Sequence, residues 1–287
     1  MNNCNYDNFI KYLDDNGKNN PWEYVADLAE KSGSYYNSTM DYVCEADKTT
    51  IEMYNQTESR KSGHKFITNI LPVPFEGNVF EAKIIILTLN PGFVEEVNQT
   101  LYNLLNENAQ KQITDYHIQN LRLQCKGIIP NEAVKFIGDR YWYNKTKELR
   151  EQHKFELSEI AIIQHIGYQS KEFYETKELK QLKSIEFTRL LLKYIIENRT
   201  DKYCFVIARC ENQWRNEFAN LELTDKLTDR NELKKLIKKS PYFPPRTWQE
   251  KAIELLCGDN KPFSNKSISN ANFASEIVKL LSLRNSP

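Results

Sequence analysis

The residue type best suited to ligand chemistry in this sequence is an asparagine that follows a strongly apolar run. Residues 84–89 are aliphatic apart from Thr88, and Asn90-Pro91-Gly92 comes directly after them. Such a run is typical of a strand buried on both faces, and the Pro-Gly pair ends it abruptly. Ligands bind at the carboxyl ends of the strands in open α/β sheets, which makes Asn90 a candidate site residue. The alternative, favoured by local turn chemistry alone, is that Asn90 only caps the turn.

Three further groups of residues could take part in chemistry, and each has a plainer structural interpretation. His165 stands at the end of a second apolar run, but a hydrogen-bonded, half-buried histidine is the commoner outcome there. The aromatic run 141–143 could stack on a nucleobase, although packing against a sheet is commoner for such rings. The lysine-rich segment 234–239 could contact phosphates or form a solvated helix face.

Several common catalytic and metal-binding motifs are absent from the sequence. It contains no G-x-x-x-x-G-K-S/T phosphate loop, no G-x-S-x-G elbow and no H-E-x-x-H zinc motif. The six cysteines stand at positions 4, 44, 125, 204, 210 and 257 and form no C-x-x-C pair. We therefore expect reduced, mostly buried thiols, no bound metal and no cofactor.

The segments that must position these residues alternate between helical and extended patterns. Residues 1–62 have helical periodicity, and we expect them to form a helical extension to a domain spanning 63–287. Apolar runs at 84–89, 160–166 and 203–208 predict strands, and periodic segments predict helices over 95–125, 184–198 and 271–284. Strands that alternate with helices imply a mainly parallel sheet covered on both faces. The sequence therefore predicts an α/β fold of three layers, α/β/α.

The composition is that of a globular protein without overall charge. Lys+Arg and Asp+Glu each total 39, which removes the simplest argument for nucleic-acid binding but leaves room for a local basic face. Apolar residues make up 40% of the chain and aromatic residues 12%, which is enough for a core. No apolar run approaches the roughly 20 residues that cross a bilayer, and the N-terminus lacks the apolar part of a secretory signal. We expect a cytoplasmic protein with no membrane partner.

Two motifs, in their order and strand context, resemble the uracil-DNA glycosylase superfamily. The sequence Ile-Ile-Leu-Thr-Leu-Asn-Pro-Gly-Phe over 85–93 is most similar to the mismatch-specific uracil- and thymine-DNA glycosylase branch, whose strand ends in Ile-Asn-Pro-Gly. The second motif of that branch is Asn-Pro-Ser-Gly-Leu-Ser, and Asn-Lys-Ser-Ile-Ser over 265–269 resembles it. Segments 71–77, 167–171 and 209–214 resemble the corresponding segments of a bacterial branch of the superfamily. The resemblance covers about residues 65–284.

The resemblance implies hydrolysis of the N-glycosidic bond of a nucleotide flipped out of DNA. Asn90 would hold the attacking water and touch the base, because its amide offers both a donor and an acceptor. The base pocket would include Pro91, Gly92, Phe93, His165 and Tyr168. The DNA contacts would come from Asn265, Lys266, Ser267, Ile268, Ser269 and Arg209, with the two serines and Asn265 on phosphates and Ile268 as an apolar wedge.

The chain departs from this family pattern at positions that matter for catalysis. The most active uracil-specific branch carries an Asp that activates water and a His in the second motif, whereas asparagines stand at both places here. Because an Asn cannot act as a general base, the reaction would be slow and would need a good leaving group. Lys266 replaces the motif Pro, and the motif Gly is missing. The alternatives are a non-catalytic nucleic-acid or nucleotide binder on the same fold, or an α/β protein that binds a small molecule or partner.

Overall fold

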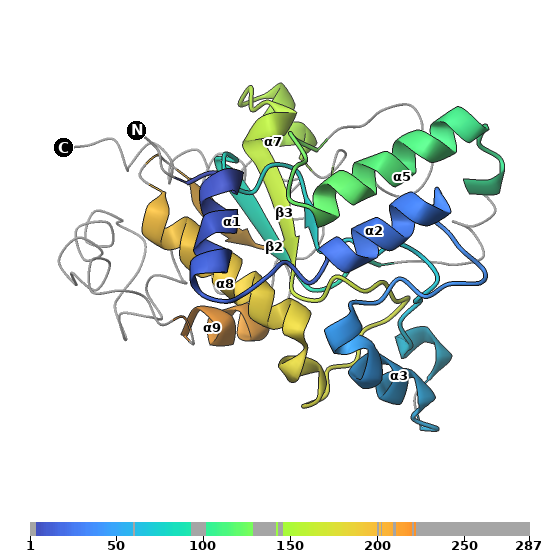
Figure 1. Cartoon of the computed structure of the whole chain (residues 1–287). Coiled ribbons are helices and arrows are strands. Elements are labelled where there is room, and N and C mark those ends of the chain that lie inside the picture. The colour runs from blue at the N-terminus through green and yellow to red at the C-terminus, as the bar shows by residue number, and fades with distance from the viewer. Residues whose placement is uncertain are drawn as a thin grey trace.

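The computed structural model describes residues 4–59, 61–92, 102–128, 142, 146–199, 201, 203–208, 211–219 and 221 (Figure 1). Within these ranges, helices surround a mixed, mostly parallel sheet, and the α/β class predicted from the sequence is confirmed. The strands are β1 (Phe75–Glu76), β2 (Ile84–Thr88), β3 (Ile160–Gln164) and β4 (Cys204–Ile207). Their order is β1-β3-β2-β4; β2 runs parallel to β3 and β4, and β1 pairs antiparallel with β3.

The unbroken apolar run of β2 follows from burial of both faces of the sheet. Every residue of β2 is buried. Successive side chains of a strand point to opposite faces: Ile85 and Leu87 belong to the larger core cluster, while Ile84 and Ile86 belong to the smaller one. Both faces of β2 are therefore lined by aliphatic side chains, and Thr88 follows them at its carboxyl end. The three strands predicted from the sequence are confirmed, each one or two residues shorter than its apolar run.

The N-terminal segment is helical, as its periodicity predicts. It forms α1 (Tyr6–Asp15), α2 (Glu23–Ser32), α3 (Lys48–Gln56) and two short 3-10 helices, η1 (Glu45–Asp47) and η2 (Ser62–His64). Their buried side chains join the same core cluster as the sheet: Phe9 of α1, for example, contacts Phe80 and two rings of α8. The boundary predicted near residue 62 thus falls between segments that share one core.

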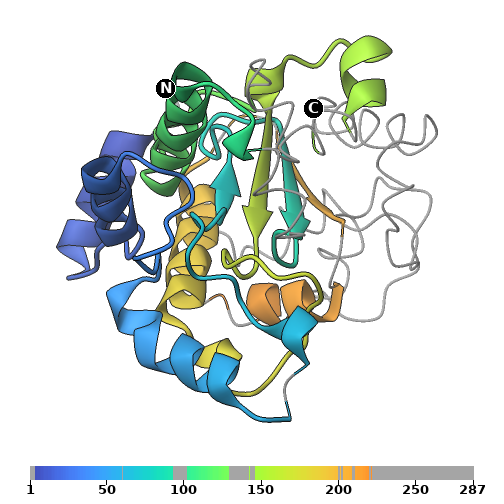
Figure 2. The ribbon, with the colours of Figure 1, turned by 90° about the vertical axis from the view of Figure 1, so that its right-hand side faces the viewer.

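The remaining helices and short helical turns follow the strands. They are α5 (Glu107–Leu121), α7 (Lys147–Glu151), η4 (Leu157–Glu159), η5 (Leu179–Gln181), α8 (Lys183–Asn198) and α9 (Glu211–Ala219). Figure 2 shows α1, α2, α5 and α8 together on one side of the sheet. The smaller core cluster on the other face contains Trp142 and Leu149. Trp142 is buried, so the packing interpretation of its aromatic run holds for this residue.

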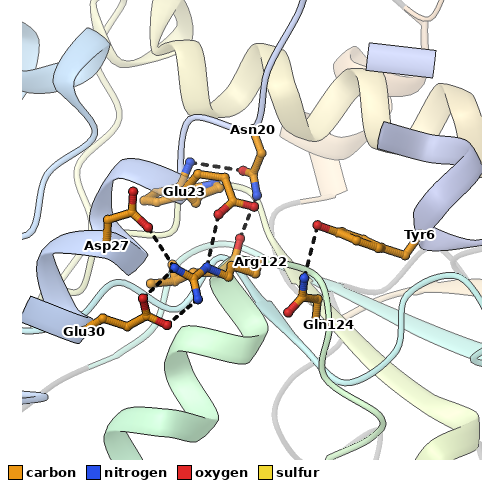
Figure 3. A network of polar contacts seen from close by, with 9 residues as sticks. Tyr6, Asn20, Glu23, Asp27, Glu30, Arg122 and Gln124 are labelled. Carbon is orange, nitrogen blue, oxygen red and sulfur yellow. Dashed lines mark hydrogen bonds and ion pairs between the residues drawn. The ribbon is translucent and has the colours of Figure 1, made fainter. Parts of the chain in front are cut away.

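An arginine at the end of α5 ties that helix to α2. Arg122 contacts Glu23, Asp27 and Glu30, which lie along one face of α2 (Figure 3). Nearby, Asn20 donates from its side-chain amide to the carbonyl of Leu121 at 2.9 Å. The hydrogen bond and charge of Arg122 hold the pKa of the Glu30 carboxyl below its usual range. These contacts fasten α2 to the helical layer that supports the sheet.

The carboxyl ends of β2 and β3 form the edge of the sheet where the sequence places its candidate residues. Figure 2 shows both strands pointing toward α9, with the α3–η2 segment at the same end. The pairing of β2 with β3 continues past both strands, since His165 N donates to Thr88 O at 2.9 Å and Ile166 N to Leu89 O at 2.8 Å. The Trp214 indole of α9 also donates to Thr88 O, at 3.0 Å.

Candidate functional site

Asn90 lies just beyond β2, half-buried at the carboxyl edge, with its amide nitrogen surrounded by oxygen acceptors. Asn90 Nδ2 donates to Ser170 Oγ at 2.8 Å. It also approaches the carbonyl oxygens of Pro91 at 3.3 Å and Tyr168 at 3.5 Å. The expected position of Asn90 at the end of a central parallel strand is confirmed. The loop after β3 therefore meets the turn after β2 at this residue.

The hydrogen bonds around Ser170 fix the orientation of the Asn90 amide. Ser170 is buried, and its Oγ donates to the carbonyl of Glu172 at 2.7 Å. A hydroxyl has one hydrogen to donate, so toward Asn90 it can only accept. The amide nitrogen, not the oxygen, must then face Ser170. No described residue donates to Asn90 Oδ1. Asn90 thus offers an acceptor to a ligand, whereas the sequence suggested both a donor and an acceptor.

The turn after Asn90 is held by the same loop. Ser170 N donates to Pro91 O at 3.3 Å, and Gly92 and Ser170 form an isolated parallel bridge. Gly92 does not have a positive φ, and a Cβ built on it would meet no atom within 4 Å. The turn at Gly92 therefore does not use the positive φ angles that glycine adopts more readily than other residues. The space beside Gly92 is open among the described residues.

Tyr168 belongs to the loop that meets Asn90, and its side chain is buried in the core. Its ring packs against Trp22 and Phe66, at centroid distances of 5.4 and 5.8 Å. Its hydroxyl donates to Asp47 Oδ2 at 2.9 Å and accepts from Cys44 N at 3.2 Å. Burial, reinforced by these two neighbours, raises the pKa of Tyr168 well above its ordinary value. Tyr168 approaches Asn90 through its carbonyl oxygen, while its ring is enclosed by the N-terminal helices.

His165 belongs to a buried charged cluster at the same edge. His165 Nε2 lies 2.9 Å from Glu217 Oε1, and the ring meets Trp214 edge-on at 5.3 Å. Glu217 also accepts from Arg189 of α8. Burial alone would raise the Glu217 pKa, but the hydrogen bonds from His165 and Arg189 outweigh it and hold that pKa below the usual value.

The ionised state of Glu217 decides which nitrogen of His165 carries a proton. A carboxylate is only an acceptor, so His165 Nε2 must donate to it. In the neutral ring, Nδ1 then holds the free lone pair; it is buried and has no hydrogen-bond partner among the described residues. His165 is therefore hydrogen-bonded, as the plainer interpretation expects, but it is buried rather than half-buried. Sequence reasoning missed Glu217 and Arg189, because no local pattern marks residues that meet only after α8 and α9 dock. It missed the role of Ser170, because the contact of Ser170 with Asn90 joins two loops far apart in the sequence.

Several candidate residues lie outside the described part of the chain. These are Phe93, Arg209 and the second motif, Asn265, Lys266, Ser267, Ile268 and Ser269, together with Tyr141, Tyr143 and the basic segment 234–239. Among the described residues, no three His, Cys, Asp or Glu side chains gather in a way that could hold a metal ion. In the same ranges, no helix has the length and apolar character needed to span a membrane. The described site therefore consists of Asn90 with its turn, the 165–172 loop, and α9.

Comparison of the whole chain with protein-family models, curated proteins and solved structures finds no match. The function is therefore inferred from the geometry at the carboxyl edge of the sheet.

Proposed function

We propose that the protein is a DNA glycosylase-like hydrolase on a three-layer α/β/α domain of the uracil-DNA glycosylase kind. The observation that carries the proposal is the side chain of Asn90. It stands at the carboxyl end of a central parallel strand, and its amide nitrogen is occupied by Ser170 and two carbonyls, which leaves Oδ1 for a ligand. A fixed acceptor at this edge suits a residue that positions a water molecule or the N–H of a base.

In the proposed reaction, water hydrolyses the bond between the sugar C1′ and the base nitrogen. The bonding electrons leave with the base and the water oxygen bonds to C1′; one water proton stays on the new C1′ hydroxyl, and the other ends on the departing base, directly or through solvent. Asn90 Oδ1 accepts a hydrogen bond from the water and holds it in place, but does not remove its proton. Catalysis by Asn90 is therefore positional, and the proposed substrates are bases that leave readily, such as uracil and damaged or modified bases.

A second function, a binder of nucleic acid or nucleotides without hydrolysis, is favoured by one observation. Two carboxylates described near the edge are engaged: Glu217 is held by His165 and Arg189, and Asp47 by Tyr168 and the start of α8. Asn90 can read a base without a general base, whereas fast hydrolysis needs one. In this alternative, Asn90 Oδ1 accepts from the N–H of a bound base.

Abasic-site formation on oligonucleotides distinguishes the two functions. Substrates carrying uracil, mismatched thymine or modified cytosines would be incubated with the wild type and with Asn90→Ala. Asn78→Ala is the matched control, since Asn78 is also a half-buried turn asparagine but precedes β2 at the opposite edge. We expect base release from at least one substrate, loss of release in Asn90→Ala and retention in Asn78→Ala.

Either of two results overturns the enzymatic proposal. One is the absence of base release from every substrate by the wild type. The other is release that Asn90→Ala leaves unchanged. Salt-dependent DNA binding without product would instead support the binding function, because phosphate contacts release counterions.

A further inference from the structure

Two loops beside Asn90 are joined into one surface. Glu172 N donates to Gly63 O at 2.7 Å, and Glu172 Oε2 lies 3.0 Å from His64 Nε2. Farther along, Ile67 N donates to Gln169 O at 2.9 Å. The Glu172 carbonyl accepts from Ser170 Oγ, which in turn accepts from Asn90. A hydrogen-bonded path therefore leads from Asn90 to the surface formed by residues 61–65 and 170–174.

This surface presents an aromatic ring to solvent. Tyr174 is 54% exposed, one of few large apolar side chains so exposed among the described residues. Its ring stacks on that of His64, with centroids 5.6 Å apart and planes 17° from parallel. The backbone beneath it is fixed, since Tyr54 OH donates to Tyr174 O at 2.8 Å. An exposed ring on a held backbone can stack on a further flat ring at little conformational cost.

Residues 61–65 and 170–174 carry more positive than negative side chains. Lys61, Lys65 and Lys171 are exposed, and none pairs with a described acidic residue. Glu172 is the acidic residue within the two loops, and it faces His64. The whole chain has no net charge, so three exposed lysines on the two loops that carry Tyr174 and His64 are a local feature. Alternating cationic and aromatic side chains are what proteins use to bind a single nucleic-acid strand.

We propose that Tyr174, backed by His64 and flanked by Lys61, Lys65 and Lys171, forms a stacking platform for an unpaired nucleobase of DNA. The base stacks on Tyr174, and the lysines contact the phosphates on either side of it. Tyr174 belongs to the segment that also carries Ser170, the acceptor of the Asn90 amide, so the platform and the candidate site share one loop. This inference rests on the proposed function, since it names a second contact for the same DNA.

Binding of a fluorescently labelled single-stranded oligonucleotide, measured at several salt concentrations, tests the platform. Tyr174→Ala should weaken binding by about 5- to 150-fold, the range that loss of one base–aromatic stack produces. Tyr174→Phe should bind as the wild type does, because it keeps the ring. Tyr24→Ala is the matched control, since Tyr24 is also exposed, at 46%, but lies on α2. Lys171→Ala should lower the slope of log affinity against log salt by about 1.

The outcomes separate this inference from the proposed function. Equal affinities of the wild type and Tyr174→Ala, both folded by thermal denaturation, overturn the platform even if Asn90 supports base release. A loss of affinity in Tyr24→Ala as large as in Tyr174→Ala overturns it as well. Failure of the wild type to bind any oligonucleotide at low salt overturns both proposals. A selective loss in Tyr174→Ala, with base release from saturating DNA retained, supports the platform.

Discussion

Replacement of Asp47 tests how the N-terminal helices support the candidate site. Asp47 is fully buried, although it is an acidic residue. Its Oδ1 accepts from Lys183 N at 2.6 Å and from Ser184 N at 3.4 Å, which caps the start of α8, and its Oδ2 accepts from Tyr168 OH at 2.9 Å. Tyr168 carries one of the carbonyls that face the Asn90 amide. Asp47 therefore links η1, α8 and the loop after β3.

The contacts of Asp47 set the size of the expected effect. Asp47→Ala removes three hydrogen bonds and leaves a buried hydroxyl and two helix N–H groups without an acceptor. Hydrogen bonds to charged groups contribute about 1.5–3 kcal/mol each, but burial of the carboxylate offsets part of this. We expect a net loss of about 3 kcal/mol in the free energy of unfolding, or a Tm lowered by roughly 6–12 °C. Asp47→Asn keeps an acceptor for the α8 N–H groups and should lose less than about 1 kcal/mol.

The pH dependence of the two variants checks the electrostatic part of the argument. Burial raises the pKa of Asp47 above 3.8, more than its hydrogen bonds lower it. A folded-state pKa above the unfolded value means that ionisation costs stability as the pH rises through the folded pKa. The free energy of unfolding of Asp47→Asn should therefore rise relative to that of the wild type as the pH rises from about 3.8, as measured by urea unfolding at each pH. If the free energy of unfolding of the wild type instead rises relative to that of Asp47→Asn over this range, the reasoning is refuted.

Two predictions concern other side chains at the edge. Ser170→Ala removes the acceptor that orients the Asn90 amide. Base release should therefore fall by about 5-fold, equivalent to about 1 kcal/mol, while oligonucleotide affinity changes little. A rate of base release equal to that of the wild type would show that Ser170 does not orient the amide. Glu217→Gln leaves Arg189 without its buried counter-charge and should lower stability at neutral pH by about 2 kcal/mol. Because the folded pKa of Glu217 lies below 4.5, this difference should shrink as the pH falls below 4.5; a difference that grows there would contradict the assigned ion pair.

The parts of the fold that sequence reasoning predicted are those encoded by neighbouring residues. The β-branched residues of β2 predict a strand without knowledge of its partners, and Pro91 marks its end. The helix over 184–198 was predicted from its apolar spacing and is observed as α8, Lys183–Asn198. By contrast, β1 has only two residues and pairs with β3 through Phe75 and Glu76, so no periodicity was available to reveal it.

The candidate site was predicted only in part, because its residues meet across long stretches of sequence. Asn90 was predicted from the end of its strand, which is a local signal. Ser170 lies 80 residues away from it in the chain, and the Ser170 hydroxyl determines which half of the amide is available. Arg189 and Glu217 are 28 residues apart and pair only because α8 and α9 both reach the carboxyl edge. Residue type and spacing identified the functional group; its orientation is a property of the tertiary structure.

The orientation of Asn90 restricts the chemistry that this edge can perform. With Nδ2 directed at Ser170 and two carbonyls, the amide can meet a ligand only through Oδ1, which accepts hydrogen bonds from at most two donors. A water molecule and the N–H of an imide base both satisfy that requirement, whereas a base edge that offers only acceptors does not. A carboxylate in place of the Asn90 amide would place an oxygen where Nδ2 now donates, close to the acceptor oxygens of Ser170, Pro91 and Tyr168. Asparagine therefore suits the loop that holds it, and an Asp at this position would need Ser170 to reverse its hydrogen bond.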